Sequence, residues 1–515
     1  MPTYLSPGVY IDEVDSGSRP IEGVGTAVAA FVGLAEQGPF NSPTLVSNWT
    51  QFTNAFGGFV VGSYLAQSVY AYFQNGGGNA YVVRIGAEPG NGNGRAHRPE
   101  LAGPQAVSGG YRFVALDAGT PEGQLTVDIR GPEGDAPEGT FKLVVRQGEQ
   151  VLEEFDRLGT GRGRQNLATA VNAGSKLIKI EEAASGAALV APPIGASVTL
   201  TAPPPPAAVP SARLSSEDYV GDVSERTGFS GLEAIDEVTM VCVPDLMSAY
   251  QQGAIDLETV QSVQLAMIAH CELMGDRIAI LDPPPGLNAQ QVKEWRVDKA
   301  GYDSKFAALY WPWVKATDPA SQSNIYMPPS GFVAGIWGRN DDTRGVHKAP
   351  ANEVVRGAIS LEVQITKNEH DLLNPVGINA LRSFPGRGIR IWGARTLSSD
   401  PAWRYLNVRR LFNYLEESIL AGTNWVVFEP NDDALWAKIR RTLSAFLVME
   451  WRKGALFGRT PDEAFYVKCD RETNPAEGID AGQVVCQIGV APVKPAEFVI
   501  FQLSQFSGGT SLVSE

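Results

Sequence analysis

The stretch that decides the fold occupies Met327–Leu361 and reads MPPSGFVAGIWGRNDDTRGVHKAPANEVVRGAISL. Pro328 and Pro329 predict an extended approach, because proline fixes φ and disfavours the α conformation in the residue before it. Four glycines then permit turns and close approach of other backbone. They are Gly331, Gly335, Gly338 and Gly345. The stretch holds no catalytic constellation, so we expect it to serve the architecture of the protein.

A second block, Leu373–Arg410, is equally rich in residues that fix the backbone. Several separated motifs of the chain occur in a defined order. They are Tyr4-Leu5-Ser6-Pro7-Gly8-Val9-Tyr10, Pro328-Pro329-Ser330-Gly331, Ala334-Gly335, Ala349-Pro350-Ala351-Asn352-Glu353, Gly377-Ile378-Asn379, Trp392-Gly393-Ala394-Arg395-Thr396 and Arg409-Arg410-Leu411-Phe412. Together they resemble the motifs of contractile tail sheath proteins of phages and related injection systems. The resemblance covers residues 1–85 and 235–505.

The resemblance implies a structural subunit of a contractile sheath, and not an enzyme. Such subunits form hexameric rings that stack helically around an inner tube, and contraction drives the tube through a target envelope. The implied partners are further copies of the chain, an inner tube protein, and baseplate and terminal cap proteins. Two alternatives stay open: a baseplate or cap protein with a sheath-like domain, and an enzyme of the α/β hydrolase type.

The resemblance also implies that free energy differences between two lattice states do the mechanical work, so we expect no cofactor. We expect cytoplasmic synthesis and assembly into a phage tail or tail-like particle. The start Met1-Pro2-Thr3-Tyr4 lacks the basic residues and apolar run of a secretory signal. No apolar segment is long enough to span a bilayer, so membrane insertion is not expected.

Charge argues against general nucleic-acid binding, because the net charge of -15 opposes contact with phosphates. The region from Arg382 to Lys453 is nevertheless locally basic. Its basic residues are Arg382, Arg387, Arg390, Arg395, Arg404, Arg409, Arg410, Lys438, Arg440, Arg441, Arg452 and Lys453. This asymmetry indicates either a specific acidic partner or arginines that are buried in ion pairs.

The residue types that usually hold metals are scattered along the chain. The four cysteines, Cys242, Cys271, Cys469 and Cys486, form no CxxC pair, so reduced core thiols are expected. The histidines, His97, His270, His347 and His370, show no metal-ligand spacing. The sequence therefore predicts no metal site.

The order of predicted elements indicates an α/β fold with a two-part body, an inserted β-rich domain and extended terminal strand arms. Apolar strands and helices alternate in two separate regions of the chain. The expected parts are an N-terminal arm (1–25), a first body part (26–85), the inserted outer domain (86–231), a second body part (232–372), a C-terminal sheath domain (373–490) and a C-terminal arm (491–515). Within the insertion, short strands such as Leu125–Ile129 and Phe141–Arg146 lie between glycine-rich turns, and Pro203–Pro206 indicates a stiff linker.

Three places invite a chemical interpretation, and each has a structural one that fits better. Gly159–Arg164 is glycine-rich but lacks the Lys-Ser/Thr ending of a phosphate-binding loop, which favours an exposed turn. Ser330 does not lie in a G-x-S-x-G elbow. Asp341-Asp342 stands beside Arg339 and Arg344, which predicts a turn neutralised by local ion pairs. No catalytic or cofactor-binding residue is therefore assigned.

Two surfaces are predicted to mediate assembly. In a helix spanning Asp432–Lys453, Lys438, Arg441 and Arg452 oppose an apolar stripe and are predicted to contact the inner tube. The apolar stripe consists of Trp436, Ile439, Leu443, Phe446 and Leu447. A merely solvated face is the alternative.

The second surface consists of the two terminal strands, which resemble the arms that link sheath subunits. Lone strands at chain ends are marginal, so each needs a partner, either in the chain's own sheet or in a neighbouring subunit. The residues assigned to this linkage are Val9, Tyr10, Ile11, Val14, Phe498, Val499, Ile500, Phe501 and Leu503.

Overall fold

The computed structural model of the 515-residue chain places two compact units, and each is described by itself. The first contains residues up to Pro89 and from Ala212 onward, and the second contains Gly90–Ser211. The described residues are 20–86, 105–108, 111–115, 125–132, 137, 140–147, 150–160, 166–175, 177–182, 193–200, 215–319, 321 and 323–502.

An eight-stranded sheet runs through the first unit in the order β18-β17-β13-β12-β11-β1-β3-β2. These strands are β1 (Ala29–Gly33), β2 (Thr44–Val46), β3 (Ala80–Arg84), β11 (Met240–Cys242), β12 (Ile278–Leu281), β13 (Ala307–Trp311), β17 (Ile378–Phe384) and β18 (Gly388–Ile391). The six inner strands are parallel, whereas the edge strands β2 and β18 pair antiparallel. The inner strands are apolar because helices cover both faces of the sheet.

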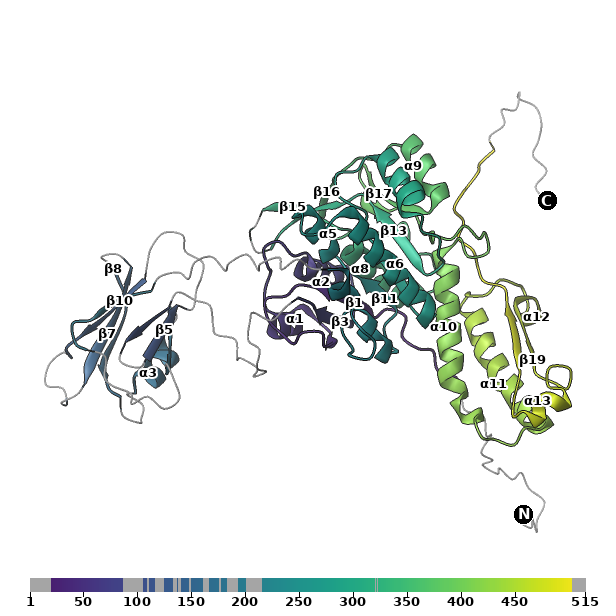
Figure 1. Cartoon of the computed structure of the whole chain (residues 1–515), viewed down its shortest axis with the longest axis horizontal. Coiled ribbons are helices and arrows are strands. Elements are labelled where there is room, and N and C mark those ends of the chain that lie inside the picture. Colours follow the sequence, from purple (N-terminus) through teal and green to yellow (C-terminus); the bar gives the residue numbers. More distant parts are fainter. Residues whose placement is uncertain are drawn as a thin grey trace, which may run out of the picture. The chain divides into compact units, whose positions relative to one another are not determined.

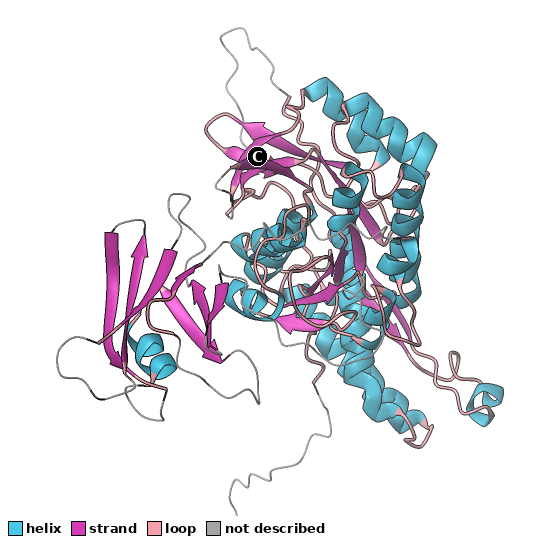
Figure 2. Ribbon diagram, turned by 60° about the vertical axis from the view of Figure 1, so that its left-hand side comes forward, coloured by secondary structure: helices cyan, strands magenta, loops and turns pink. Residues whose placement is uncertain are grey.

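Helices lie on both sides of this sheet (Figures 1 and 2). One face packs against α1 (Trp49–Phe56), α2 (Leu65–Gln74) and α8 (Ser330–Arg344). The other face packs against α4 (Ser216–Val220), α5 (Asp245–Gln251), α6 (Leu257–Met274), α7 (Ala289–Glu294) and the π-helical turn Trp295–Ala300 that follows it. The body is therefore an α/β structure, as the alternation of elements predicted, and the structure shows that its layers number three.

The decisive stretch forms a helix where turns were expected. Three of its glycines lie inside α8, which begins directly after Pro329. A methyl group on Gly331 would lie 2.5 Å from the Ser68 carbonyl oxygen, and one on Gly335 would lie 2.3 Å from that of Tyr72. The expectation of close approach is confirmed, because α2 and α8 pack backbone against backbone. Only Gly345, with φ of 86°, ends the helix as a turn residue.

A small antiparallel sheet and short helices complete the body. The sheet has the order β15-β14-β16, with β14 (Val314–Thr317), β15 (Asn324–Met327) and β16 (Ala358–Leu361). The short helices are the 3-10 turn Ser230–Ala234, α9 (Lys367–Leu373) and the 3-10 turn Asn374–Val376. β15 and β16 flank α8, so this sheet fixes both ends of the decisive stretch.

The C-terminal part of the first unit is a helical pair with a small sheet. Its elements are α10 (Leu406–Thr423), α11 (Asp433–Arg452), α12 (Pro461–Ala464), β19 (Phe465–Lys468), α13 (Ala476–Asp480) and β20 (Gln487–Val490). In Figure 1, α10 lies between the body and α11, and β19 lies on the far side of α11. The apolar stripe of α11 is buried here as predicted, together with Leu411, Tyr414 and Leu415 of α10.

The second unit is β-rich and has its own core. One sheet has the order β10-β6-β7-β8 and the other β4-β5-β9, and α3 (Leu167–Gly174) contributes to the core. The strands are β4 (Gln105–Ser108), β5 (Tyr111–Ala115), β6 (Leu125–Arg130), β7 (Phe141–Gln147), β8 (Gln150–Leu158), β9 (Ile178–Glu182) and β10 (Ser197–Thr199).

The structure draws two domain boundaries differently from the sequence. Tyr219 and Phe229 belong to the core of the body, so residues 215–231 are not part of the insertion. β17 and β18 complete the central sheet, so the body continues well past residue 372. Sequence patterning missed both points because short elements show too little periodicity to reveal which core they join.

Side-chain caps fix the starts of two helices. The Asp432 side chain accepts from the Leu435 N–H at the start of α11, and the Asn48 side chain accepts from the Gln51 N–H at the start of α1. Asp400-Pro401 forms a turn, and α10 starts later, with Tyr405 at its N-cap. The 3-10 turn Asn424–Val426 follows α10 directly.

The contact between α2 and α8 yields a test with an internal control. Alanine normally favours a helix over glycine by about 1 kcal/mol, but overpacking a core costs about 1–3 kcal/mol. Because the Gly335→Ala methyl would meet backbone, we expect a lower urea midpoint. In the control Gly338→Ala, the nearest atom is 3.4 Å away, so its midpoint should stay equal or rise. Equal midpoints for both variants would contradict the tight crossing.

Candidate assembly surfaces of the C-terminal region

The carboxyl edge of the parallel strands is where α/β enzymes usually place their sites, and here two buried carboxylates act as helix caps at this edge. Asp245, after β11, accepts hydrogen bonds from the backbone N–H groups of Leu34 at 2.6 Å and Leu65 at 3.0 Å, and from that of Tyr64. Asp282, after β12, accepts one from Ser330 N at 2.9 Å. Asp245 thus accepts from free backbone N–H groups at the start of α2, and Asp282 accepts from one at the start of α8.

Burial shifts the pKa values of the two capping carboxyl groups. It raises the pKa of Asp245 to about 6 and that of Asp282 to about 7, although the hydrogen bonds oppose the shift. A raised carboxyl pKa in a pocket is a common sign of catalysis. Both carboxylates are almost fully buried and bonded to helix ends, so their geometry is structural. Within the described residues, no three His, Cys, Asp or Glu side chains are arranged to hold a metal.

A buried ion pair joins the C-terminal helices to the body. Arg410 of α10 donates to both carboxylate oxygens of Asp341 in α8, at 2.9 and 2.5 Å, and each side chain is 4% exposed. Thr26 adds to the contact, since its hydroxyl donates to Asp341 at 2.7 Å and its carbonyl accepts from Arg410 at 3.0 Å. The guanidinium also lies 4.7 Å from the centre of the Trp337 ring.

The local ion pairs predicted for Asp341 are not formed. Arg339 donates instead to the carbonyl oxygens of Asn75 at 2.8 Å and Val354 at 2.7 Å. The local turn was wrong because the segment is helical, which turns Asp341 toward α10 rather than toward its sequence neighbours.

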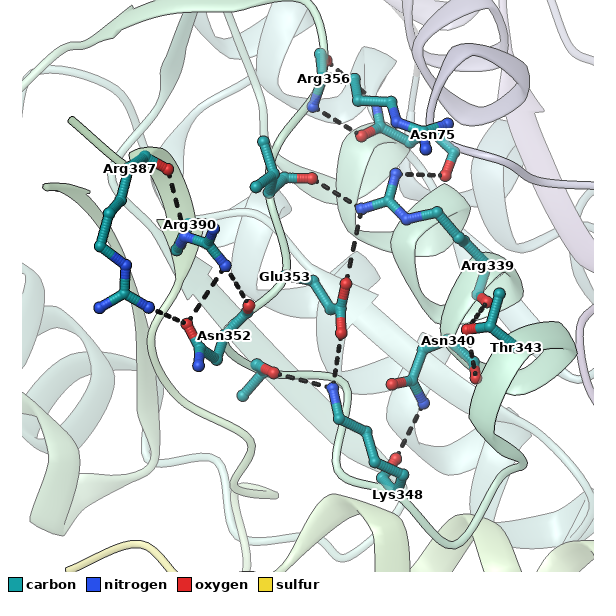
Figure 3. A network of polar contacts seen from close by, with 12 residues as sticks. Asn75, Arg339, Asn340, Thr343, Lys348, Asn352, Glu353, Arg356, Arg387 and Arg390 are labelled. Atoms are coloured by element: carbon teal, nitrogen blue, oxygen red, sulfur yellow. Dashed lines mark hydrogen bonds and ion pairs between the residues drawn. The ribbon is translucent and has the colours of Figure 1, made fainter.

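The motif Ala349-Pro350-Ala351-Asn352-Glu353 forms a polar network between α8 and the sheet edge (Figure 3). Asn352 has φ of 60°, and its carbonyl oxygen accepts from Arg390 of β18 at 2.7 Å. Glu353 pairs with Lys348 at 2.7 Å. The motif therefore ties the chain after α8 to the edge strand β18.

Several basic residues of the C-terminal part are paired inside the molecule. Arg409 of α10 bonds Glu416 at 3.0 Å and lies 4.5 Å from the Trp403 ring. Arg395 bonds Glu497 at 2.6 Å. Together with Arg410, these residues favour ion pairing as the reason for much of the basic character.

Glu497 anchors the last described segment to the body. Its carboxylate accepts from Arg395 Nε at 2.9 Å and Nη2 at 2.6 Å, from Asn374 at 2.7 Å and from the Tyr405 hydroxyl at 3.3 Å. Burial alone would raise its pKa, but the hydrogen bonds from Arg395 and Asn374 outweigh burial and lower the pKa of Glu497. The chain is thus fixed immediately before the C-terminal residues assigned to subunit linkage.

The residues after this anchor are apolar and exposed. Phe498, Val499, Ile500 and Phe501 are 72%, 66%, 82% and 83% exposed. The expected strand is not formed in the single chain, since these residues pair with no described strand. Pairing with the chain's own sheet, one of the two alternatives, is therefore not observed for them. Leu503 and the N-terminal residues Val9, Tyr10, Ile11 and Val14 lie outside the described residues.

The polar side of α11 carries the three residues predicted to contact a tube. Arg441 and Arg452 are exposed. Lys438 is half-buried, with its ammonium 4.3 Å from the centre of the Trp425 ring. Lys438 is thus partly engaged within the chain, whereas the two arginines are presented to the outside. No helix among the described residues has the length and apolar character needed to cross a membrane.

Comparison with known proteins agrees with this architecture. The family model for the phage tail sheath protein central domain matches residues 215–397, and that for the phage tail sheath C-terminal domain matches 398–506. The tail sheath protein of Burkholderia phage BcepMu is 23% identical, over 96% of this chain and 95% of its own length. A putative prophage major tail sheath protein of Pseudomonas aeruginosa is 27% identical, over 56% of this chain and 72% of its own. The tail sheath protein of Vibrio phage KVP40 is 26% identical over 43% of this chain, which spans 34% of that protein.

Solved structures share the fold over nearly the whole chain. One is the sheath complex of an extracellular contractile injection system, PVC, in its contracted state, with a TM-score of 0.57, 24% identity and coverage of 98% of this chain and 99% of that one. Another is the contracted helical sheath of the anti-feeding prophage, with a TM-score of 0.59, 23% identity and coverage of 98% and 100%. The chain belongs to the phage tail sheath family. It is a structural subunit of a contractile sheath, and so a component of a phage tail or tail-like particle.

Sequence reasoning missed the residues that hold the surfaces in place. Glu497 gave a weak signal as the last charge before an apolar run, but its partners are distant in sequence. Asp245 and Asp282 follow short apolar strands, a position that suggests function as readily as capping. Only the packed structure distinguishes these roles.

The ion pair between α8 and α10 can be tested against the next residue in the chain. Asp341→Asn leaves the Arg410 guanidinium buried without a counter-charge, which typically costs about 3–5 kcal/mol. The exposed neighbour Asp342→Asn changes net charge equally and should shift stability by no more than about 0.5 kcal/mol. Unfolding in urea followed by tryptophan fluorescence measures both. Indistinguishable midpoints would show that the pair does not hold the two parts together.

Proposed function

We propose that this chain polymerises into hexameric rings stacked helically around an inner tube, and that contraction drives the tube through a target envelope. The observation that carries the proposal is the apolar run Phe498–Phe501, exposed in the single chain directly after the anchor Glu497. Uncharged segments of high β propensity aggregate unless they find a partner. In the proposed assembly, this partner is a neighbouring subunit, and binding it would cover the exposed apolar run.

β-augmentation is the mode of linkage that fits this segment. The sheet β19–β20 has only two strands among the described residues, and two-stranded sheets are marginal alone. An end strand from a neighbour would add main-chain hydrogen bonds and cover apolar surface. The N-terminal arm, with Val9, Tyr10, Ile11 and Val14, would join the same connection.

Anchored arms suit a sheath that must rearrange without falling apart. Glu497 fixes the arm to its own subunit through Arg395, Asn374 and Tyr405. The strand beyond it would bind the neighbour, so bodies can rotate while links persist. The work would come from differences in interface free energy between two lattices. This mechanism requires neither an enzymatic step nor a cofactor.

The exposed side of α11 is proposed as the contact with the inner tube. Arg441 and Arg452 supply the charge that an acidic tube surface would meet, and Lys438 lies beside them. Exposed ion pairs contribute about 0–1 kcal/mol each, so such contacts would be weak enough to release the tube on contraction.

The remaining partners and the life cycle follow from the same proposal. Relatives occur in sheath polymers and in baseplate complexes, and this chain would associate likewise with a baseplate, and also with a terminal cap. Synthesis and assembly would take place in the cytoplasm. The second unit, with its own core, would face outward as a decoration.

The arm proposal predicts the outcome of two truncations. Ending the chain after Glu497 keeps the anchor and removes the apolar run, so we expect a soluble monomer that forms no cylinders. Ending it after Ser504 keeps the run and should preserve cylinders. Electron microscopy and analytical ultracentrifugation distinguish these products. Ordered cylinders from the shorter chain would refute the arm model.

The tube contact predicts a charge effect specific to α11. Lys438→Glu combined with Arg441→Glu should reduce tube-templated assembly at least tenfold and make the remainder less sensitive to salt. The control combines Lys299→Glu with Lys367→Glu, two exposed residues elsewhere, and changes net charge equally. Assembly on purified tubes, measured by sedimentation, compares them. Equal assembly of the two double variants would place the tube elsewhere.

A further inference from the structure

Two of the four cysteines face each other across the small C-terminal sheet. Cys469 directly follows β19, and Cys486 directly precedes β20. The antiparallel register pairs Lys468 with Gln487, so the next pair outward is Cys469 with Cys486. The sequence separation of these cysteines had suggested independent thiols, because it does not reveal the hairpin.

The type of this pair determines how close the two residues lie. Ala491 donates its N–H to the Ala464 carbonyl at 2.8 Å, which makes Ala464 and Ala491 a hydrogen-bonded pair. Such pairs alternate with non-hydrogen-bonded pairs, so Cys469 and Cys486 form a non-hydrogen-bonded one. Their Cα atoms are then about 4.5 Å apart, within the range of about 4.4–6.8 Å that a disulfide requires. The two thiols also lie close enough for each to influence the pKa of the other.

The surroundings hold the pair in place and leave one side open. The Asn474 amide donates to Val485 O at 3.1 Å and accepts from Val485 N at 2.6 Å, which fixes the loop between the cysteines. Cys469 is buried, but Cys486 is only half-buried, so a small reagent can reach it.

The other two cysteines provide a contrast within the same chain. Cys242 of β11 faces the side of the central sheet that packs against α2 and α8. Cys271 of α6 lies on the opposite side. These two thiols therefore belong to the cores on opposite faces of the central sheet.

We propose that Cys469 and Cys486 form a cross-strand disulfide when the protein meets a low-molecular-weight disulfide such as oxidised glutathione. The Cys486 thiolate attacks the reagent, forming a mixed disulfide and releasing one glutathione thiolate. Cys469 then attacks the Cys486 sulfur and releases the second. The two protein thiols are oxidised by two electrons, the reagent is reduced to two thiols, and the two protons pass to the released thiolates.

The reaction should be slow at neutral pH and faster in mild alkali. Burial raises the pKa of Cys486 to about 12 and also raises that of Cys469. The thiolate is the attacking species, so its fraction increases about tenfold per pH unit below the pKa. A protein kept in a reducing compartment would therefore stay reduced.

The disulfide would fasten the hairpin that the arms are proposed to extend, and this consequence rests on the proposed function. Joining β19 to β20 removes freedom from the unfolded chain between the cysteines. A particle that leaves the reducing cytoplasm would then acquire a stiffer acceptor sheet at every subunit.

Thiol counting on the full-length chain tests the proposal without any assembly. The chain is incubated with oxidised glutathione at pH 8.5, denatured in an alkylating reagent and digested. We expect four free thiols to fall to two, with one peptide pair linked through Cys469 and Cys486. Oxidation should raise the melting temperature of the chain by roughly 5 °C. Cys486→Ser should abolish both effects, and Cys469→Ser should do the same.

Two results would overturn the proposal. One is retention of four thiols in the folded chain, and the other is a link that involves Cys242, Cys271 or a second molecule. Because the measurement needs no polymer, failure of cylinder formation would count against the proposed function and leave the disulfide standing. Peptide mapping of the natural sequence gives the answer even if a serine variant does not fold.

Discussion

The buried contact of Arg410 with Asp341 links the C-terminal helices to the α/β body. Arg410 comes from α10, Asp341 from α8, and Thr26 from the chain leading into β1. Three segments far apart in sequence therefore share one charge pair with almost no water around it. An uncompensated charge in such a place is strongly unfavourable, so the three segments keep a single relative arrangement. This ion pair therefore positions α11 and the segment beyond Glu497 relative to the body.

The contact between Arg410 and Asp341 also depends on the glycines of α8. α8 can carry Asp341 toward α10 only because its own backbone approaches α2 so closely. Asp282 at its start and the network around Asn352 after its end hold the helix in register. The stretch whose composition suggested turns is a helix. Its glycines allow it to pack directly against the backbone of α2.

The sequence predicted long elements well and short or distant relationships poorly. The apolar stripe of α11 is buried, as the helical spacing of its residues predicted. Helical glycines defeated the prediction at α8, because their low propensity is offset by tertiary packing. The anchor at Glu497 and the pairing of Cys469 with Cys486 depend on contacts that local pattern does not encode. The order of the motifs indicated the family. The side-chain contacts that fix each surface became visible only in the folded structure.

The position of the second unit within the chain has a consequence for synthesis. β1 pairs with β3 on one side and with β11 on the other, and Gly90–Ser211 lies between β3 and β11 in sequence. A ribosome therefore completes the second unit while β1 still lacks its later neighbour. Strand pairing over such a separation is slow, and an uncovered edge is prone to aggregation. The partly formed central sheet therefore stays open to aggregation until β11 has been synthesised.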